Sequence, residues 1–281
     1  MNTASDLRRR LARQVADAHA GLGGLWLGLV SGSTVEHLAD ERSDVDMSLV
    51  FETLPPEAAL RAACPAAWTW QMGTLADGGG VVAFPWHGIE IQIAYTDRAS
   101  LLAELDQVLV AHDPDTPLHK LAEGMAKAEP LAGAAELVAL QARIADYPEG
   151  LARAMAAHWL GRITPWRAIA QIVHRDALLW SRELQHQAGL RLLGALAGLN
   201  DRYFTSFQFK RMGRFVDALP RKPAAFAARL EAVLMAPPGP GFDALHALEG
   251  EVIELVAARW PDLDLSAVRR RHGDYTPAEP R

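Results

Sequence analysis

Two carboxylates one residue apart, Asp44 and Asp46, are the side chains of this sequence best suited to chemistry. Asp44 precedes and Asp46 belongs to an apolar segment, 45–51, which has the length and composition of a β-strand. Strand side chains alternate between the faces of a sheet, so both aspartates are expected on one face while Val45 and Met47 point into a core. Neighbouring carboxylates repel each other unless a cation lies between them, and hard oxygen ligands suit a divalent ion. The spacing therefore predicts a Mg²⁺ site.

A third carboxylate, Glu90, lies in a later segment, 89–95, where isoleucines alternate with polar residues. If this strand pairs with 45–51, Glu90 joins the two aspartates on one surface and completes a site for one or two Mg²⁺ ions. Such ions would clamp a nucleoside triphosphate and stabilise an in-line displacement. Gln92 and Asp97 are the alternatives for the third position. The structural alternative for the carboxylates is the solvated side of a strand.

The residues before the first aspartate favour phosphate binding. An apolar run, 25–30, predicts a strand, and Gly32 and Ser33 follow it at a turn into a short helix. Free backbone N–H groups and the helix dipole favour an anion at such a turn. A capping box, with Ser33 as the N-cap and Glu36 three residues later, is the structural alternative for this serine.

The surrounding pattern predicts an α+β fold: a mixed sheet with flanking helices, followed by an all-helical domain. The expected N-terminal elements are helices at 4–20 and 56–63 and strands at 25–30, 45–51, 68–72, 81–84 and 89–95. The expected later helices are 98–110, 117–127, 133–145, 148–160, 165–188, 189–198, 206–218, 222–235 and 242–259. The corresponding domains are 1–110, 111–262 and a loosely ordered tail, 263–281.

Composition limits the possible functions of the chain. Its 281 residues are half hydrophobic, and the net charge of −6 argues against a general nucleic-acid binder. The single cysteine excludes an internal disulfide and fits a reducing compartment. The N-terminal segment lacks the apolar core of a signal peptide, and no stretch is long enough to span a bilayer. A cytoplasmic protein without a membrane partner is expected. Trp159, Trp166 and Trp180 are predicted to belong to the core of the helical domain.

The order Gly-Ser, then Ser-Asp-Val-Asp at 43–46, then a glutamate on a later strand resembles the nucleotidyltransferases of the DNA polymerase beta superfamily. The spacing from Ser33 to Asp44 is similar to that in aminoglycoside adenylyltransferases. The resemblance covers the N-terminal third by motif and the remainder by architecture, since a helical domain is usual after the sheet. The sequence departs from the family pattern at Glu36-His37-Leu38, where a glycine is common.

The resemblance implies a role for each matching residue. Gly32 and Ser33 would hold the β- and γ-phosphates of a nucleotide, and Asp44 and Asp46 would bind Mg²⁺. Glu90 would be either the third metal ligand or the general base that takes the proton from an acceptor hydroxyl.

In the helical domain, a late tyrosine–lysine pair is similar to one that contacts the triphosphate in adenylyltransferases of this type. Here the matching residues are Tyr203 and Lys210, in the segment LNDRYFTSFQFKRMG.

The activity implied is the transfer of a nucleoside monophosphate, AMP from ATP or another nucleoside triphosphate, onto a hydroxyl with release of pyrophosphate. A small-molecule acceptor such as an aminoglycoside is favoured, and a protein or RNA acceptor is compatible with the motif. The alternative is a protein of the same fold that binds nucleotide without turnover, as a regulatory or antitoxin-like module.

Overall fold

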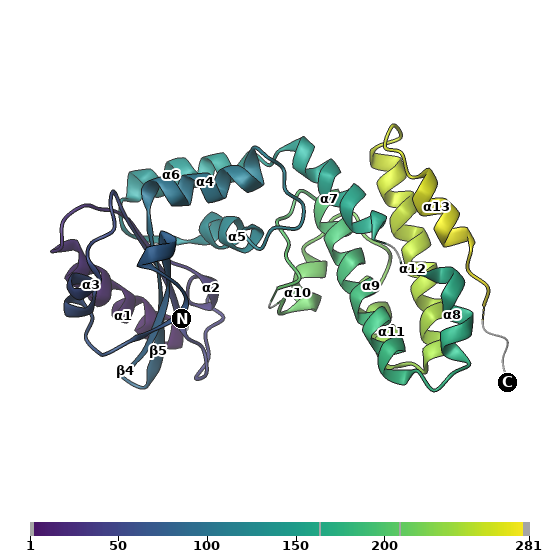
Figure 1. Cartoon of the computed structure of the whole chain (residues 1–281), viewed down its shortest axis with the longest axis horizontal. Helices are drawn as coiled ribbons and strands as arrows, with labels where there is room; N and C mark the ends of the chain where they lie inside the picture. The colour runs from purple at the N-terminus through teal and green to yellow at the C-terminus, as the bar shows by residue number, and fades with distance from the viewer. Residues whose placement is uncertain (1–2, 163, 208, 278–281) are drawn as a thin grey trace. The chain divides into compact units, whose positions relative to one another are not determined.

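The computed structural model describes residues 3–162, 164–207 and 209–277 of the chain, which form an α+β structure in two compact units. Unit 1 comprises residues 1–107 and 121–146, and unit 2 comprises residues 108–120 and 147–281. Unit 1 holds the sheet and unit 2 is helical (Figure 1). This arrangement confirms the predicted fold class.

Unit 1 is built on a six-stranded mixed sheet in the order β3-β4-β5-β2-β1-β6. Its strands are β1 (Leu25–Val30), β2 (Val45–Phe51), β3 (Thr69–Thr74), β4 (Gly79–Trp86), β5 (Ile89–Asp97) and β6 (Glu129–Ala132). The central pair, β2 and β5, is parallel, and the other neighbours are antiparallel. The two strands that carry Asp46 and Glu90 therefore pair directly, which was the condition for grouping Glu90 with the aspartates.

Alternation along the central strands separates a core face from a polar face. Val45, Met47 and Leu49 of β2 lie in the hydrophobic core, as do the alternate residues Ile91 and Ile93 of β5. Helices α1 (Thr3–Ala20) and α3 (Glu57–Ala63) contribute to the same core and contact each other, and Figure 1 shows them together beside the strands. The aspartates therefore belong to the opposite face from this core.

The remaining helices of unit 1 complete its surface. They are α2 (Gly32–Val35), the 3₁₀ turn η1 (Leu75–Asp77) and α6 (Ala134–Ala145), which packs against β1 and β6. Two further helices, α4 (Arg98–Leu109) and α5 (His119–Lys127), begin in one unit and end in the other.

Unit 2 contains seven further helices among its described residues: α7 (Glu149–Gly161), α8 (Trp166–Val173), α9 (Leu178–Leu199), α10 (Met212–Asp217), α11 (Phe226–Met235), α12 (Pro238–Arg259) and α13 (Ser266–Gly273). The long helix α9 lies beside α7 and α12 (Figure 1). Trp159 and Trp166 are buried as predicted, but Trp180 is half exposed, so its assignment to the core was wrong. Within the described ranges, the helices are too short or too polar to cross a membrane.

Several predicted boundaries differ from the structure. The predicted break at residue 189 is wrong because α9 is continuous there, and the actual break, at His174–Ala177, lies inside the predicted helix 165–188. The expected division at residue 110 differs from the observed one, because the chain returns to unit 1 with β6 and α6. The expected loose tail also differs, since α13 forms at 266–273 with Val268 buried.

Candidate functional site

The two aspartates lie at the start of β2. Asp44 directly precedes the strand and Asp46 is its second residue, and both side chains are half-buried. Val45 and Met47 are 0% and 3% exposed, so the alternation expected from the sequence is present. The arrangement brings two carboxylates to the polar face of the sheet at its centre.

Gly32 and Asp46 are in direct contact. Gly32 has a φ of 64°, and a Cβ atom built on it would lie 2.2 Å from Oδ2 of Asp46. The backbone N–H of Ser31 donates to the carbonyl oxygen of Asp46 at 2.9 Å. A side chain at residue 32 would therefore collide with the carboxylate, and only glycine accommodates both the backbone angle and the contact.

Glu90 lies beside Asp44 on the neighbouring strand. In the parallel register, Asp46 is opposite Gln92, and Asp44 and Glu90 are each two residues earlier. The side-chain nitrogen of Gln92 donates to Oδ2 of Asp44 at 3.2 Å and to Oε1 of Glu90 at 2.7 Å. Glu90 is exposed. Gln92 thus links the two carboxylates, whereas Asp97 bonds with Ser100 at the far end of β5.

The donor set has the chemistry of a Mg²⁺ site, because all three side chains offer carboxylate oxygens. Gly32 leaves the space that the Asp46 carboxylate occupies. In residues 3–162, 164–207 and 209–277, however, no group of three His, Cys, Asp or Glu side chains is arranged to hold a metal ion. The Gln92 amide lies between Asp44 and Glu90.

A buried arginine from α1 holds the segment that leads into β2. Arg8 is 3% exposed, and its guanidinium donates to the carbonyl oxygen of Ser43 at 2.9 and 2.6 Å. The hydroxyl of Ser43 donates to Asp40, whose carboxylate also accepts from the backbone of Arg42. These hydrogen bonds lower the pKa of Asp40. Asp44 is therefore preceded by a fixed turn.

Arg8 was not identified from the sequence, because it is one of three consecutive arginines, Arg8 to Arg10, and the sequence does not show which of them is buried. Leu7, the residue before it, is 36% exposed. The turn at Asp40–Ser43 was the signal that could have led to a buried donor such as Arg8, because buried backbone carbonyls require a hydrogen-bond donor.

The turn after β1 is also fixed from two sides. Arg9 of α1 donates to the carbonyl oxygen of Val35, and Lys127 of α5 pairs with Glu36 at 2.9 Å. His37 adopts a φ of 57°. This left-handed conformation is one that glycine adopts more readily, and here a histidine adopts it.

The capping-box interpretation of Ser33 is wrong. Helix α2 begins at Gly32, with Ser31 at its N-cap and no side-chain capping bond, and Glu36 lies at its C-terminal end. Ser33 is half-buried, and its carbonyl oxygen accepts from the backbone N–H of Leu38 at 3.0 Å. The turn therefore places Gly32 beside Asp46, and Ser33 follows it in α2.

Tyr203 and Lys210 belong to unit 2 and precede α10. Tyr203 is buried and packs on Tyr147 and His119, with ring centroids 4.8 and 6.0 Å apart. Lys210 is exposed and lies outside any helix. The predicted helix 206–218 is wrong for this lysine, because Arg211 has a φ of 61° and α10 begins only after it.

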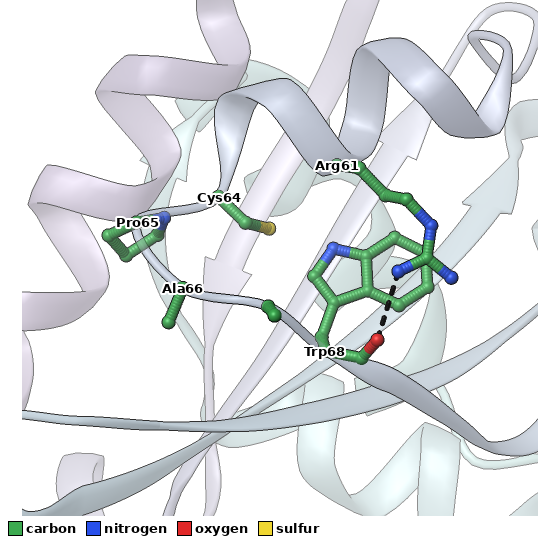
Figure 2. Close-up of a pocket in the computed structure, with 6 residues that line it drawn as sticks. Arg61, Cys64, Pro65, Ala66 and Trp68 are labelled. Carbon is green, nitrogen blue, oxygen red and sulfur yellow. Dashed lines mark hydrogen bonds between the residues drawn. The ribbon is translucent and has the colours of Figure 1, made fainter.

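A separate pocket of about 370 Å³ lies after α3 in unit 1 (Figure 2). Its walls come from the segment between Arg61 and Trp68, and the guanidinium of Arg61 lies 3.8 Å from the centroid of the Trp68 ring. None of the predicted site residues lines it.

Cys64 lies at this pocket and contacts a buried polar pair. Its sulfur is 3.4 Å from the hydroxyl of Tyr95, which is 2.7 Å from Nε2 of His19. Burial raises the pKa of Cys64 and of Tyr95 and lowers the pKa of His19. All three groups are therefore neutral near pH 7, which is typical of packing.

Comparison with known proteins finds structural similarity without sequence similarity. No family model matches the chain, and no curated protein matches its sequence. Among solved structures, the chain is similar to a nucleotidyltransferase-like protein from Exiguobacterium sibiricum 255-15. The two share 8% identity and a TM-score of 0.43 over 92% of this chain and 75% of that chain. The interpretation of the site therefore rests on the residues of this chain.

Proposed function

We propose that this protein is a Mg²⁺-dependent nucleotidyltransferase that moves a nucleoside monophosphate, AMP from ATP, onto a hydroxyl and releases pyrophosphate. The supporting observation is the grouping at the start of the two parallel strands. Asp46 lies against Gly32, and Glu90 is linked to Asp44 through one amide. Carboxylates beside a tight, glycine-containing turn are the combination that a metal–triphosphate complex requires.

Each residue of the grouping has a proposed role. Asp44 and Asp46 hold the ion, which when bound neutralises charge on the phosphates. The turn at Gly32 and Ser33 accommodates the β- and γ-phosphates. Glu90 is exposed and accepts the proton of the acceptor hydroxyl or completes the metal ligands.

The remaining roles extend to unit 2. The proposal keeps Tyr203 and Lys210 as the pair that contacts the triphosphate; Lys210 is exposed and Tyr203 is buried. The proposed acceptor is a small hydroxyl-bearing molecule such as an aminoglycoside. A protein and an RNA are the alternative acceptor classes. The proposed setting is the cytoplasm.

The test is nucleotide transfer with each of the four nucleoside triphosphates, labelled at the α-phosphate, against a panel of these acceptors. We expect labelled acceptor and free pyrophosphate with ATP and Mg²⁺, and neither product with EDTA. Glu90→Gln and the double variant Asp44→Ala/Asp46→Ala are expected to lose transfer while remaining folded by circular dichroism. Transfer that persists in the double variant would exclude this site as the centre of the reaction.

A second candidate function is nucleotide binding without turnover, as in a regulatory or antitoxin-like module. The observation that favours it is the Gln92 amide, which compensates Asp44 and Glu90 without a cation. Both candidate functions require nucleotide binding, so ATP with Mg²⁺ should raise the melting temperature under either of them. Stabilisation of the wild type without any transfer across the panel would favour the binding module.

A further inference from the structure

Two histidines join the C-terminal helix α13 to α12, which lies beside it (Figure 1). The imidazole rings of His246 and His272 are stacked, with centroids 3.7 Å apart and planes 8° from parallel. Nε2 of each ring lies close to the backbone carbonyl oxygen of the other histidine, at 2.9 and 3.0 Å. A carbonyl oxygen only accepts, so each Nε2 carries a hydrogen and donates it. The stack and its two reciprocal hydrogen bonds form a histidine clasp between the helices.

Aromatic side chains surround the histidine clasp. The indole of Trp166, at the start of α8, meets His246 edge-on, with centroids 4.9 Å apart. The ring of Tyr275 stacks on His246 at 4.6 Å, and its hydroxyl donates to Asp243 at 2.6 Å. Trp166 is 1% exposed, and both histidines are half-buried. The two imidazoles are therefore partly withdrawn from water, which disfavours their charged forms.

The histidine clasp accommodates one positive charge but not two. The first added proton leaves both Nε2–H donors in place, because a neutral imidazole of this tautomer takes it on Nδ1. A second proton places two like charges 3.7 Å apart in a half-buried site, where water screens them weakly. Burial lowers the pKa of His246, partly offset by its hydrogen bond to the His272 carbonyl; the His272 ring lowers this pKa further and Asp243 raises it.

Other charged groups on the helices around the histidine clasp do not reproduce this effect. Glu249 of α12 accepts a hydrogen bond from Trp166, and burial raises its pKa to about 7, with Arg271 among the groups that oppose the rise. The stability that Glu249 contributes is complete at low pH and is lost as the pH rises, the opposite of the histidines. The remaining charged side chains of α7, α8, α12 and α13 are either exposed, which describes Arg167 and Arg270, or paired with another side chain: Glu149, Arg153, His158, Glu251, Glu254, Arg259 and Arg269.

We propose that the histidine clasp is a proton-operated switch that releases α13 from α7, α8 and α12 when both rings are charged. Above about pH 6.5, where an unperturbed histidine titrates, the uncharged pair holds the helix. As the pH falls further, the released state takes up the proton that the closed clasp rejects, so the opening constant rises by about tenfold for each pH unit and proton. Release uncovers the ring of Trp166. The switch lies within unit 2 and is independent of the proposed nucleotide site.

The test is hydrogen exchange of the full chain, measured by mass spectrometry on peptides that cover α13 at about pH 7.5 and about pH 5.5, on either side of the histidine titration. With rates corrected for the intrinsic effect of pH, we expect the protection of α13 to fall about tenfold in the wild type. His246→Gln and His272→Gln each keep an N–H donor and remove one of the two charges, so both should lose this fall. His186→Gln removes an exposed histidine of α9 and is the matched control, expected to behave like the wild type.

The outcomes decide between the switch and a clasp that is only structural. Equal corrected protection of α13 at both pH values in the wild type overturns the proposal. A fall of the same size in the wild type and in both clasp variants also overturns it, because a group outside the clasp would then be responsible. If a clasp variant leaves α13 unprotected at both pH values, NMR titration of the wild-type imidazoles decides. The second protonation must then coincide with loss of α13 protection, and two charged rings with α13 still protected overturn the switch.

Discussion

At the scale of single residues, backbone angle and contact decide which positions of the turn after β1 are constrained. Gly32 has a left-handed φ, which favours glycine, and it lies against Asp46, where a Cβ atom would collide with the carboxylate. Five residues later, His37 adopts a similar φ without being a glycine. A residue other than glycine therefore adopts this conformation in a turn that the Arg9–Val35 hydrogen bond and the Lys127–Glu36 ion pair hold.

Replacing Gly32 by alanine tests this constraint. Gly24 is the matched control: it has a φ of 69° and no atom within 4 Å of where its Cβ would lie, whereas the Cβ of residue 32 meets Asp46. We expect Gly24→Ala to cost about 1 kcal/mol for the backbone angle alone and Gly32→Ala to cost about 1–3 kcal/mol more. Urea unfolding measures both. Equal costs would mean that the Asp46 contact is not part of the folded protein.

Glu249 of α12 predicts a pH dependence of stability. It is 2% exposed, accepts a hydrogen bond from the Trp166 indole at 2.8 Å, and burial raises its pKa to about 7. A carboxyl whose pKa is raised in the fold contributes stability that is complete below about pH 4.5, its unfolded pKa, and is lost as the pH rises through 7.

Glu249→Gln keeps the acceptor for Trp166 and removes this titration. We expect the variant to gain up to about 3 kcal/mol relative to the wild type between pH 4.5 and pH 8. Unfolding free energies of both proteins across that range provide the measurement. Because the two proteins differ only at this residue, the difference between the two curves isolates Glu249. Parallel curves would show that folding does not raise the pKa of Glu249.

At the scale of elements, the position of the aspartates depends on how α1 holds the turn before β2. The guanidinium of Arg8 is buried and donates to the carbonyl oxygens of Ser43 and Ala4. Arg8→Met keeps the length of the side chain and leaves these carbonyls without their donor. We expect it to cost about 2–3 kcal/mol in urea unfolding and to weaken Mn²⁺ binding. Arg10→Met, an exposed neighbour on α1, should change neither.

The sheet strands could be predicted from the sequence more closely than the helices of unit 2. Alternation in 45–51 and 89–95 marks one buried face, and both strands form there. In α9, by contrast, Gly189 packs against Leu230 instead of ending the helix, so its role depends on a partner far along the chain. Strand β6 has four residues and includes Pro130, which is too short for periodicity to reveal.

The residues of the candidate site likewise differ in how well the sequence predicts them. Asp44, Asp46, Glu90 and the glycine turn are recognisable from spacing, because each lies in or beside a strand whose pattern is local. The link through Gln92 and the buried Arg8 are not, because each depends on a side chain reaching a neighbouring element.

At the scale of the whole molecule, the two units are not divided at the residue where the amino-acid composition changes. Leucine- and alanine-rich segments begin near residue 98, yet residues 121–146 belong with the sheet. Strand β6 pairs with β1, and Glu129 accepts two hydrogen bonds from Arg9 of α1 at 2.7 and 2.8 Å. Composition alone cannot reveal that the chain returns to the sheet unit at residues 121–146.

This division predicts which fragment folds. A fragment of residues 1–146 retains β6 and α6, whose Leu137, Leu140 and Ile144 are buried. A fragment of residues 1–110 loses them and leaves the edge of β1 unpaired. Unpaired edges and exposed apolar side chains favour aggregation. We therefore expect 1–146 to unfold cooperatively in urea with a dispersed amide NMR spectrum, and 1–110 to aggregate or to lack a cooperative transition.

A third fragment, residues 1–133, separates the two contributions, since it keeps β6 and lacks α6. Its stability should lie below that of 1–146, because three buried apolar side chains contribute roughly 1.5–3 kcal/mol each when fully removed from water. If 1–110 unfolds as cooperatively and with the same free energy as 1–146, then β6 and α6 do not belong to the sheet unit. In that case the boundary near residue 110 that composition indicates is the physical one.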